Sequence, residues 1–337
     1  MKETIRLALI GAGRAGMIHA RNFASRVPYA KMAAVCDVVE ENARQAAAEL
    51  GIAWYTDWHD ILADRTIDAV IVAAPTEFHH EIVIEAARTK KHILCEKPMA
   101  MNREECIRMN EAAQAVGVNL QIGFMRRFDA NFRRAKELIE TGSIGQVVTV
   151  KSLTHGPSTP HEWMYDIEKS NGPLAEVNSH DIDTLRWFTG SEAESLYAIA
   201  GNFRCDEAKT KYPDFYDTVL MNVRMKNGML GNIDGAQGVQ YGYDARVDIV
   251  GTEGYIEIGG LAGSTTLLYT KDKHFRGDTV KSWSDLFFEA YVNEDISFVR
   301  SIREGKPPEV SGTDGMAAVD IVRAGNESIK TGQIVRL

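Results

Sequence analysis

Three glycines near the start of the chain have the spacing that binds the phosphates of a dinucleotide. They are Gly11, Gly13 and Gly16, and they follow the apolar run Ile5–Ile10, which predicts a β-strand. The first glycine would turn the chain, the second would let the backbone approach a pyrophosphate, and the third would let a helix pack closely on the strand. The start of that helix would then offer free N–H groups and a positive dipole end to the phosphates.

The choice of dinucleotide depends on Asp37. It follows a second predicted strand at Ala33–Cys36 and lies 21 residues after Gly16. A carboxylate there accepts hydrogen bonds from ribose hydroxyls and repels a 2′-phosphate. The next two residues are valines, so no arginine follows to receive that phosphate. The sequence therefore predicts NAD rather than NADP as cofactor, with Arg14 and Ala15 at the helix start among its contacts.

Two further groups of polar residues could carry acid-base chemistry. The first is the pair Glu96 and Lys97, which follows the apolar run His92–Cys95 and precedes Pro98. Open α/β sheets bind ligands at the carboxyl ends of their strands, so Lys97 is a candidate catalytic lysine. A Glu-Lys pair is also common as a solvated surface pair, and the pattern alone does not separate the two.

The second group is Glu176 and His180. The stretch from Leu174 to Phe188 predicts one helix, which would place the two side chains at i and i+4 on one face. A carboxylate that accepts from one ring nitrogen fixes the tautomer and leaves the other nitrogen to take a proton. The same spacing also describes an ordinary helical ion pair.

These residues must be positioned by the elements around them. Up to residue 122, short apolar runs alternate with helical patterns, which is typical of βαβ units and a parallel sheet. The predicted strands are 5–10, 33–36, 69–73, 92–95 and 119–122, and the predicted helices are 15–25, 40–50, 82–89 and 104–116.

The pattern changes from residue 123 onward. Strands are predicted at 147–152, 195–203, 217–225, 229–236, 245–250, 255–258 and 265–269, and helices at 132–140, 181–188, 285–303 and 313–330. Asn227-Gly228 between two strands is a hairpin signal. We therefore expect an α/β fold with an NAD-binding Rossmann domain at 1–122. An α+β domain built on a large, mainly antiparallel sheet would follow at 123–337 and bind substrate.

Composition limits the class of protein. The chain has 337 residues, of which 45% are hydrophobic and 25% charged, as in ordinary globular proteins. Its net charge of −9 argues against nucleic-acid or anionic-membrane binding. No apolar run reaches the roughly 18 residues of a membrane span, and the first residues lack a secretory signal pattern. The cysteines have no metal or disulfide spacing, so we expect no metal, free thiols and a cytoplasmic location.

The motifs together resemble those of the glucose–fructose oxidoreductase/inositol dehydrogenase (Gfo/Idh/MocA) family. The resemblance covers essentially the whole chain. Its family-wide motifs are the glycine turn, Pro75–His79, Glu96–Pro98 and His180–Asp183, while Gly123–Asp129, Tyr241–Asp244 and the ending from Ala324 are similar to the inositol dehydrogenase branch.

The resemblance implies an oxidoreductase that oxidises a secondary hydroxyl of a cyclic polyol or sugar with NAD. It implies that Lys97 contacts substrate near the nicotinamide, that His180 is the general base and that Glu176 supports it. Further cofactor contacts are expected at Ala74, Pro75, Thr76, His79, Glu96, Lys97 and Arg127. Substrate contacts are expected at Lys97, Arg127, His155, Trp163, Tyr165, Glu176, His180 and Tyr243.

Several alternatives stay open. Arg127 could pair with Asp129 instead, and Trp163 and Tyr165 could be local packing. The family commonly has aspartate where Glu176 stands, so a pyranoside or glycoside ring hydroxyl is an alternative substrate. A third hypothesis is that the protein binds NAD without catalysis and has a regulatory function. A sheet face without helices predicts pairing with a second subunit. The resemblance also implies a homo-oligomer, either a tetramer or a dimer.

Overall fold

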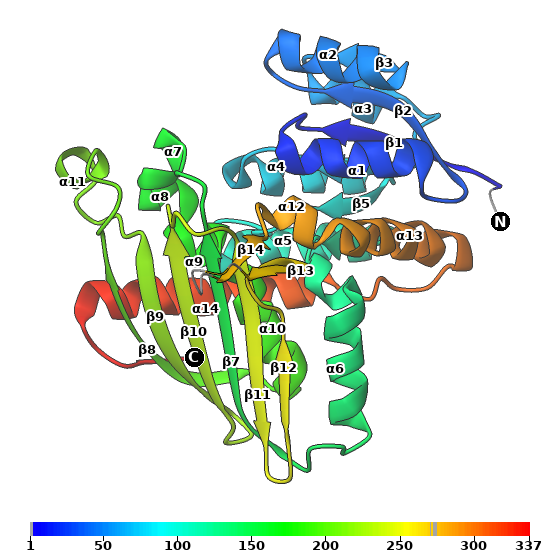
Figure 1. Cartoon of the computed structure of the whole chain (residues 1–337). Coiled ribbons are helices and arrows are strands. Elements are labelled where there is room, and N and C mark those ends of the chain that lie inside the picture. Colours follow the sequence, from blue (N-terminus) through cyan, green and yellow to red (C-terminus); the bar gives the residue numbers. More distant parts are fainter. Residues whose placement is uncertain (1–2, 270, 272–274) are drawn as a thin grey trace. The chain divides into compact units, whose positions relative to one another are not determined.

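The computed structural model describes residues 3–269, 271 and 275–337, and the chain forms two units (Figure 1). The first unit comprises Met1–Phe128 and Glu289–Val319, and the second comprises Asp129–Phe288 and Asp320–Leu337. A single boundary at residue 123 does not describe this division. The chain returns to the first unit because Phe298 and Val299 of helix α13 (Phe288–Glu304) belong to its hydrophobic core.

The first unit is built on a six-stranded sheet in which all neighbouring strands are parallel. The strand order is β3-β2-β1-β4-β5-β6, which confirms the predicted doubly wound class. The central strands are buried along most of their length, as expected where helices cover both faces. The strands are β1 (Ile5–Ile10), β2 (Ala30–Cys36), β3 (Ala53–Tyr55), β4 (Ala69–Val72), β5 (His92–Cys95) and β6 (Leu120–Ile122).

The helices between these strands follow the predicted order. They are α1 (Arg14–Ser25), α2 (Glu40–Leu50), α3 (Trp58–Ala63), α4 (Thr76–Arg88) and α5 (Arg103–Val116), with the short 3-10 turn η1 (Met125–Phe128) after β6. Helix α4 begins six residues before its predicted start, because the apolar period that marked it begins only at Ile82. The short elements β3 and α3 were not predicted.

The parallel register aligns the carboxyl ends of the strands. Ile10 lies opposite Cys36 on one side and Val72 on the other. The strands end together, so the residues that follow them share one edge of the sheet. These residues are Gly11, Asp37, Ala73, Glu96 and Gly123.

The second unit is built on a seven-stranded mixed sheet of order β12-β11-β7-β10-β9-β8-β15. The β7–β10 pair is parallel and the other neighbours are antiparallel, which confirms the predicted, mainly antiparallel sheet. The strands are β7 (Val147–Gly156), β8 (Ala193–Gly201), β9 (Thr218–Met225), β10 (Leu230–Gln237), β11 (Asp244–Gly251), β12 (Tyr255–Ile258) and β15 (Val335–Arg336). A separate pair consists of β13 (Ala262–Tyr269) and β14 (Phe275–Thr279).

Helix α10 (Ser179–Thr189) covers one face of this sheet. Gly231 and Gly235 of β10 make room for it, since a Cβ there would collide with Leu185 and Asn178 respectively. The remaining helices are α6 (Ala130–Glu140), α7 (Glu162–Tyr165), α8 (Ile167–Ser170), α9 (Gly172–Glu176), α11 (Ala208–Lys211), α12 (Trp283–Leu286) and α14 (Gly312–Thr331), whose last part belongs to this unit.

Two expectations from composition can be compared with the structure. All four cysteines are buried free thiols, as predicted: Cys36, Cys95, Cys106 and Cys205. Within the described ranges, none of the helices combines the length and the apolar character that a membrane crossing requires.

Candidate functional site

The three glycines of the N-terminal turn have different structural reasons. Gly11 has φ +100°, and a Cβ there would lie 2.5 Å from the Ala73 carbonyl oxygen. A Cβ on Gly16 would lie 2.1 Å from the Gly11 carbonyl oxygen, so this glycine lets α1 pack against the turn. Gly13 has an ordinary φ of −71°, and a Cβ at this position would meet no atom within 4 Å. Its missing side chain therefore leaves open space beside the turn, which fits a pyrophosphate.

Asp37 lies beside this turn and helps to hold it. Its Oδ2 accepts the Ala12 N–H at 2.8 Å, and its Oδ1 accepts the Val39 N–H at 2.9 Å. Each carboxylate oxygen has two lone pairs, so acceptor capacity remains for ribose hydroxyls. The first turn of α1, which includes the exposed Arg14, contains no acidic residue that would repel a phosphate. The turn thus fits the predicted dinucleotide.

The loop after β4 is tied to the loop after β5 by His79. This histidine is buried, with Nδ1 at 2.9 Å from the Pro98 carbonyl oxygen and Nε2 at 2.7 Å from the Ala74 carbonyl oxygen. Burial lowers its pKa below the ordinary value, although the two carbonyls oppose that shift. Thr76, also expected near the cofactor, begins α4 and is buried. His79 therefore fixes the geometry of both loops.

Glu96 and Lys97 lie at the carboxyl end of β5, and they are not a solvated surface pair. Glu96 is 4% exposed, whereas Lys97 is half-buried and precedes Pro98 through a cis peptide bond. The Lys97 N–H donates to Glu96 Oε2 at 3.0 Å, and Glu96 Oε1 lies 3.0 Å from Nε2 of His19. The backbone of Lys97 is thus anchored by a buried carboxylate.

The predicted continuous helix around Glu176 and His180 is wrong. Helix α9 ends at Glu176 and α10 begins after a two-residue break. The N–H groups of Val177 and Asn178 both donate to the Pro173 carbonyl, at 2.9 and 3.1 Å, which widens the turn. An i,i+4 pair requires an unbroken turn, so the helical argument for these two side chains does not apply.

His180 is the second residue of α10 and is 7% exposed. Its neighbours in sequence fix this end of the helix to the sheet. Asp181 accepts from the Asn178 amide at 2.8 Å and from the Ser152 hydroxyl at 2.6 Å, and all three are buried. A Cβ on Gly235 would lie 2.1 Å from Asn178 Oδ1, so the strand leaves room for that amide. The position of His180 is therefore set by a buried polar cluster.

The segment before Glu176 is anchored to α14. Asn171 has a left-handed φ of 56°, and its carbonyl accepts the Asn326 amide at 2.8 Å. The Tyr216 hydroxyl donates to Asn326 Oδ1 at 2.7 Å and accepts the Leu174 N–H at 3.3 Å. The segment therefore has defined supports of its own.

Arg127 lies in η1 and forms an ion pair. Its Nη2 lies 2.9 Å from Asp314 Oδ1, while Asp129 accepts the N–H groups of Asn131 and Phe132 and caps α6. Asp314 is thus one partner of this arginine, within the same unit.

His155 lies near the end of β7, between two polar partners. Its Nδ1 is 2.5 Å from the Tyr241 hydroxyl, and its Nε2 is 2.9 Å from Asp234 Oδ1. Because side chains alternate along a strand, His155 is on the face opposite Ser152 and Thr154. Those two residues are buried on the α10 side. His155 therefore lies on the face of the sheet opposite α10, which carries His180.

The aromatic candidates differ in their surroundings. Trp163 on α7 is exposed. Tyr165 is buried in a small apolar cluster with Cys205 and Phe215, and its hydroxyl donates to Glu207 at 2.5 Å. These contacts favour the local-packing interpretation of Tyr165. Tyr243 is buried beside Gly156 of β7.

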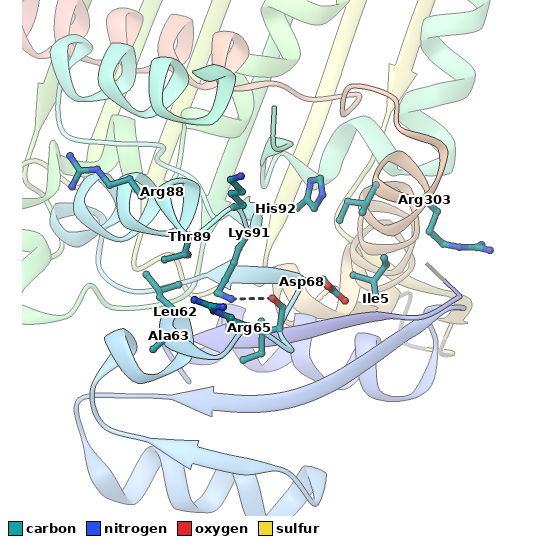
Figure 2. A pocket seen from close by; sticks show the side chains of 13 residues that line it. Ile5, Leu62, Ala63, Arg65, Asp68, Arg88, Thr89, Lys91, His92 and Arg303 are labelled. Atoms are coloured by element: carbon teal, nitrogen blue, oxygen red, sulfur yellow. Dashed lines mark hydrogen bonds between the residues drawn. The ribbon is translucent and has the colours of Figure 1, made fainter. Parts of the chain in front are cut away.

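A basic pocket of about 720 Å³ lies at the opposite edge of the parallel sheet (Figure 2). It is lined by Ile5 and His92, which begin β1 and β5, and so lies at the amino ends of the strands. Lys91 on its wall donates to the carbonyls of Asp64 and Ile67. The glycine turn and Lys97 follow the carboxyl ends of these strands, so the pocket lies away from the candidate chemistry.

Sequence reasoning missed three residues around Glu96. His19 and Asn22 of α1 and Asp295 of α13 are buried and form hydrogen bonds behind the loop after β5 that carries Glu96 and Lys97, here called the lysine loop. The spacing of His19 and Asn22, one helical turn apart on a buried face, was the available signal.

Comparison with known proteins agrees with these features. Residues 5–124 match "Oxidoreductase family, NAD-binding Rossmann fold", and residues 132–257 match "GFO/IDH/MocA C-terminal domain". A myo-inositol 2-dehydrogenase of Thermotoga maritima is 34% identical over 99% of this chain and 98% of its own length. A scyllo-inositol 2-dehydrogenase (NAD(+)) of Bacillus subtilis is also 34% identical, over 100% and 97%.

A solved structure supports the same assignment. The scyllo-inositol dehydrogenase from Lactobacillus casei, with bound cofactor NAD(H) and scyllo-inositol, superposes with a TM-score of 0.90. It is 26% identical in sequence and covers 99% of each chain. The two matched domains, the full-length relatives and the shared fold lead to one conclusion: this chain belongs to the GFO/IDH/MocA oxidoreductase family.

Proposed function

We propose that this protein is an NAD-dependent dehydrogenase that oxidises a ring hydroxyl of a cyclic polyol, with an inositol as its substrate class. Two full-length relatives with inositol dehydrogenase names support this substrate class. The open space beside Gly13 and the carboxylate of Asp37 support NAD. A carboxylate at the end of the second strand disfavours the 2′-phosphate of NADP.

The residues divide the acid-base work. When bound, the nicotinamide supplies the hydride acceptor, and the protein orients substrate and handles the proton. His180 takes the hydroxyl proton on an imidazole nitrogen. The family resemblance, rather than helical spacing, supports a helping role for Glu176. The Lys97 ammonium donates a hydrogen bond to the same oxygen and stabilises developing alkoxide charge.

One observation carries this proposal. Lys97 lies on the strand-end edge that also holds the Gly13 turn, and a buried carboxylate anchors its backbone. A lysine held at that edge is better explained as a catalytic residue than as half of a solvated surface pair.

The test is a panel of inositols, aldoses and glycosides with NAD and NADP, measured as kcat/KM. Lys97→Ala and His180→Ala should each lower kcat strongly while NAD binding persists. The matched controls are Lys90→Ala and His161→Ala, which alter exposed side chains. Near-normal turnover in either catalytic variant would contradict its role, and a failure of every polyol to reduce NAD would contradict the proposed activity.

The same panel separates a second substrate class. Glu176 stands where the resembled family commonly has aspartate, and its longer side chain moves the carboxylate by about one C–C bond. If a pyranoside or glycoside gave the highest kcat/KM, that compound class would replace inositols as the proposed substrate. NAD reduction with any of these compounds rules out a purely regulatory NAD-binding protein.

We also propose that the protein is a cytoplasmic homo-oligomer, either a dimer or a tetramer. Apolar side chains are exposed along the sheet face opposite α10, and a second copy would cover them. They are Tyr197, Ile199, Leu220, Leu230, Val250 and Tyr255. Four buried free thiols suit a reducing compartment. Light scattering measures the oligomeric state.

A further inference from the structure

His19 lies fully buried between two carboxylates. Its Nδ1 is 2.6 Å from Asp295 Oδ1, and its Nε2 is 3.0 Å from Glu96 Oε1. The exposed fractions of its side chain and of the Asp295 side chain are 0%, and that of Glu96 is 6%. The three residues come from α1, the lysine loop and α13, all within the first unit. We refer to them as the His19 cluster.

The other carboxylate oxygens of the cluster are also used. The Asn22 amide donates to Asp295 Oδ2 at 2.9 Å, and the Lys97 N–H donates to Glu96 Oε2 at 3.0 Å. Tyr291 of α13 packs edge-on against the His19 ring, with centroids 5.3 Å apart. Each of the four carboxylate oxygens of Asp295 and Glu96 therefore accepts a hydrogen bond within the first unit.

The geometry determines the charge on His19. A neutral imidazole donates from one nitrogen only, so hydrogen bonds to two ionised carboxylates require the doubly protonated ring. Burial raises the pKa of Asp295 above its ordinary value, while the charge and hydrogen bond of His19 and the hydrogen bond of Asn22 oppose that shift. Burial by itself lowers the pKa of His19, but Asp295 and Glu96 together raise it well above the ordinary value. Burial likewise favours a protonated Glu96, yet its hydrogen bond with His19 leaves the pKa of Glu96 lowered. The cluster thus keeps an ionised Glu96 beside a histidine cation.

We propose that His19 is a positioning residue for Lys97, acting through Glu96, and this inference rests on the proposed role of Lys97. A buried anion that loses its cation is costly, so Glu96 would take up a proton or rotate. Either change loosens its hold on the Lys97 N–H. Gly123 borders the Glu96 side chain: a Cβ there would lie 3.1 Å from Glu96 Cδ.

The same cluster links two parts of the site. His19 belongs to α1, whose first turn follows Gly13, while Glu96 precedes the lysine. The His19 cation therefore fixes α1 to the lysine loop. A misplacement of about 1 Å in a reacting group can cost roughly 10²-fold in rate.

The first experiment examines the charge directly in the wild-type protein. In ¹⁵N NMR of histidine-labelled protein near pH 8, His19 should show two protonated ring nitrogens, and Asp295→Asn should abolish that pattern. The exposed His59 is the internal comparison, since its partner Asp57 is also exposed. A neutral His19 at that pH would overturn the proposal, and this outcome can be observed in the wild-type protein alone.

The second experiment measures function. His19→Gln keeps an N–H donor for Glu96 but removes the charge, so kcat should fall by about 10²-fold while the Kd for NAD stays near wild type. Gly123→Ala pushes on Glu96 without altering charge and should also lower kcat, although less. His59→Gln is the matched control and should leave kcat unchanged.

The outcomes separate this inference from the proposed function. If Lys97→Ala keeps its turnover, the catalytic role of Lys97 fails. If Lys97→Ala is inactive while folded His19→Gln keeps wild-type kcat, the positioning role fails. A lowered Tm with full kcat would make the cluster structural only. Should His19→Gln not fold, Gly123→Ala and the wild-type NMR spectrum decide the question.

Discussion

The carboxylate of Asp37 accepts the backbone N–H of Ala12 at 2.8 Å. The residue expected to select the cofactor therefore also holds the turn that receives its phosphates. A change at this position has two separable effects, one on the conformation of the turn and one on the recognition of the ribose.

Asp37→Ser should change the preference between cofactors. Loss of hydrogen bonds from ribose hydroxyls to a charged acceptor, worth about 1.5–3 kcal/mol, should raise the NADP-to-NAD ratio of kcat/KM by roughly 10- to 100-fold. Steady-state kinetics with both cofactors measure this ratio. Asp64→Ser, which also removes an acceptor for a backbone N–H, is the control and should leave the ratio unchanged. A wild-type enzyme that already prefers NADP would contradict the assignment.

Gly11→Ala and Gly13→Ala should separate folding from cofactor binding. A Cβ on Gly11 collides with the Ala73 carbonyl and requires a left-handed backbone, so this variant should lose stability. A Cβ on Gly13 meets no protein atom, so the second variant should keep its Tm and bind NAD more weakly. Thermal unfolding and NAD titration measure the two effects. A Gly13→Ala protein with wild-type affinity for NAD would show that no ligand approaches there.

Gly235→Ala should impair the histidine end of α10. Its Cβ would displace the Asn178 side chain and disturb the Asp181 cluster beside His180. We expect a lower kcat with little change in NAD affinity. Gly231→Ala is the matched control on the same strand and face, because its Cβ meets the flexible end of Leu185. Equal losses of kcat in the two variants would argue against a specific effect on His180.

The stability of the protein should depend on pH through His19. Burial lowers the pKa of this residue, but two carboxylates outweigh burial and raise it above 6.5 in the folded state. The stabilisation is complete below about pH 6.5 and is lost as the pH rises through the folded-state pKa. The unfolding free energy should fall above pH 6.5 by at most about 1.4 kcal/mol per pH unit for this proton.

Urea unfolding of the wild type and of His19→Gln over this pH range measures that slope. The variant should show a flatter dependence, because its side chain at position 19 does not titrate. Parallel slopes in the two proteins would mean that His19 binds its proton no more tightly in the folded chain than in the unfolded one.

The parts of the site that local sequence determines could be predicted. The turn at Gly11, the carboxylate of Asp37 and the position of Lys97 each follow a strand whose apolar run marks its end. A strand-turn-helix unit is contained in a short stretch of chain, so its spacing is visible in the sequence.

The parts that depend on distant residues could not be predicted. The break before α10 involves Asn178, whose side chain fits against Gly235 on a strand much later in the chain. His19 and Asp295 are 276 residues apart. The orientation of His155 depends on which face of the sheet α10 covers. In each case a tertiary contact decided what the local pattern left open.

The return of the chain to the first unit has a consequence for synthesis on the ribosome. The Rossmann core includes Phe298 and Val299, so it cannot close until α13 has been translated, long after β6 has emerged. Until then the nascent unit holds Glu96 and His19 without Asp295 and exposes the apolar surface that α13 covers. A fragment ending at Phe128 would keep that surface open, so the cofactor-binding unit matures only near the end of translation.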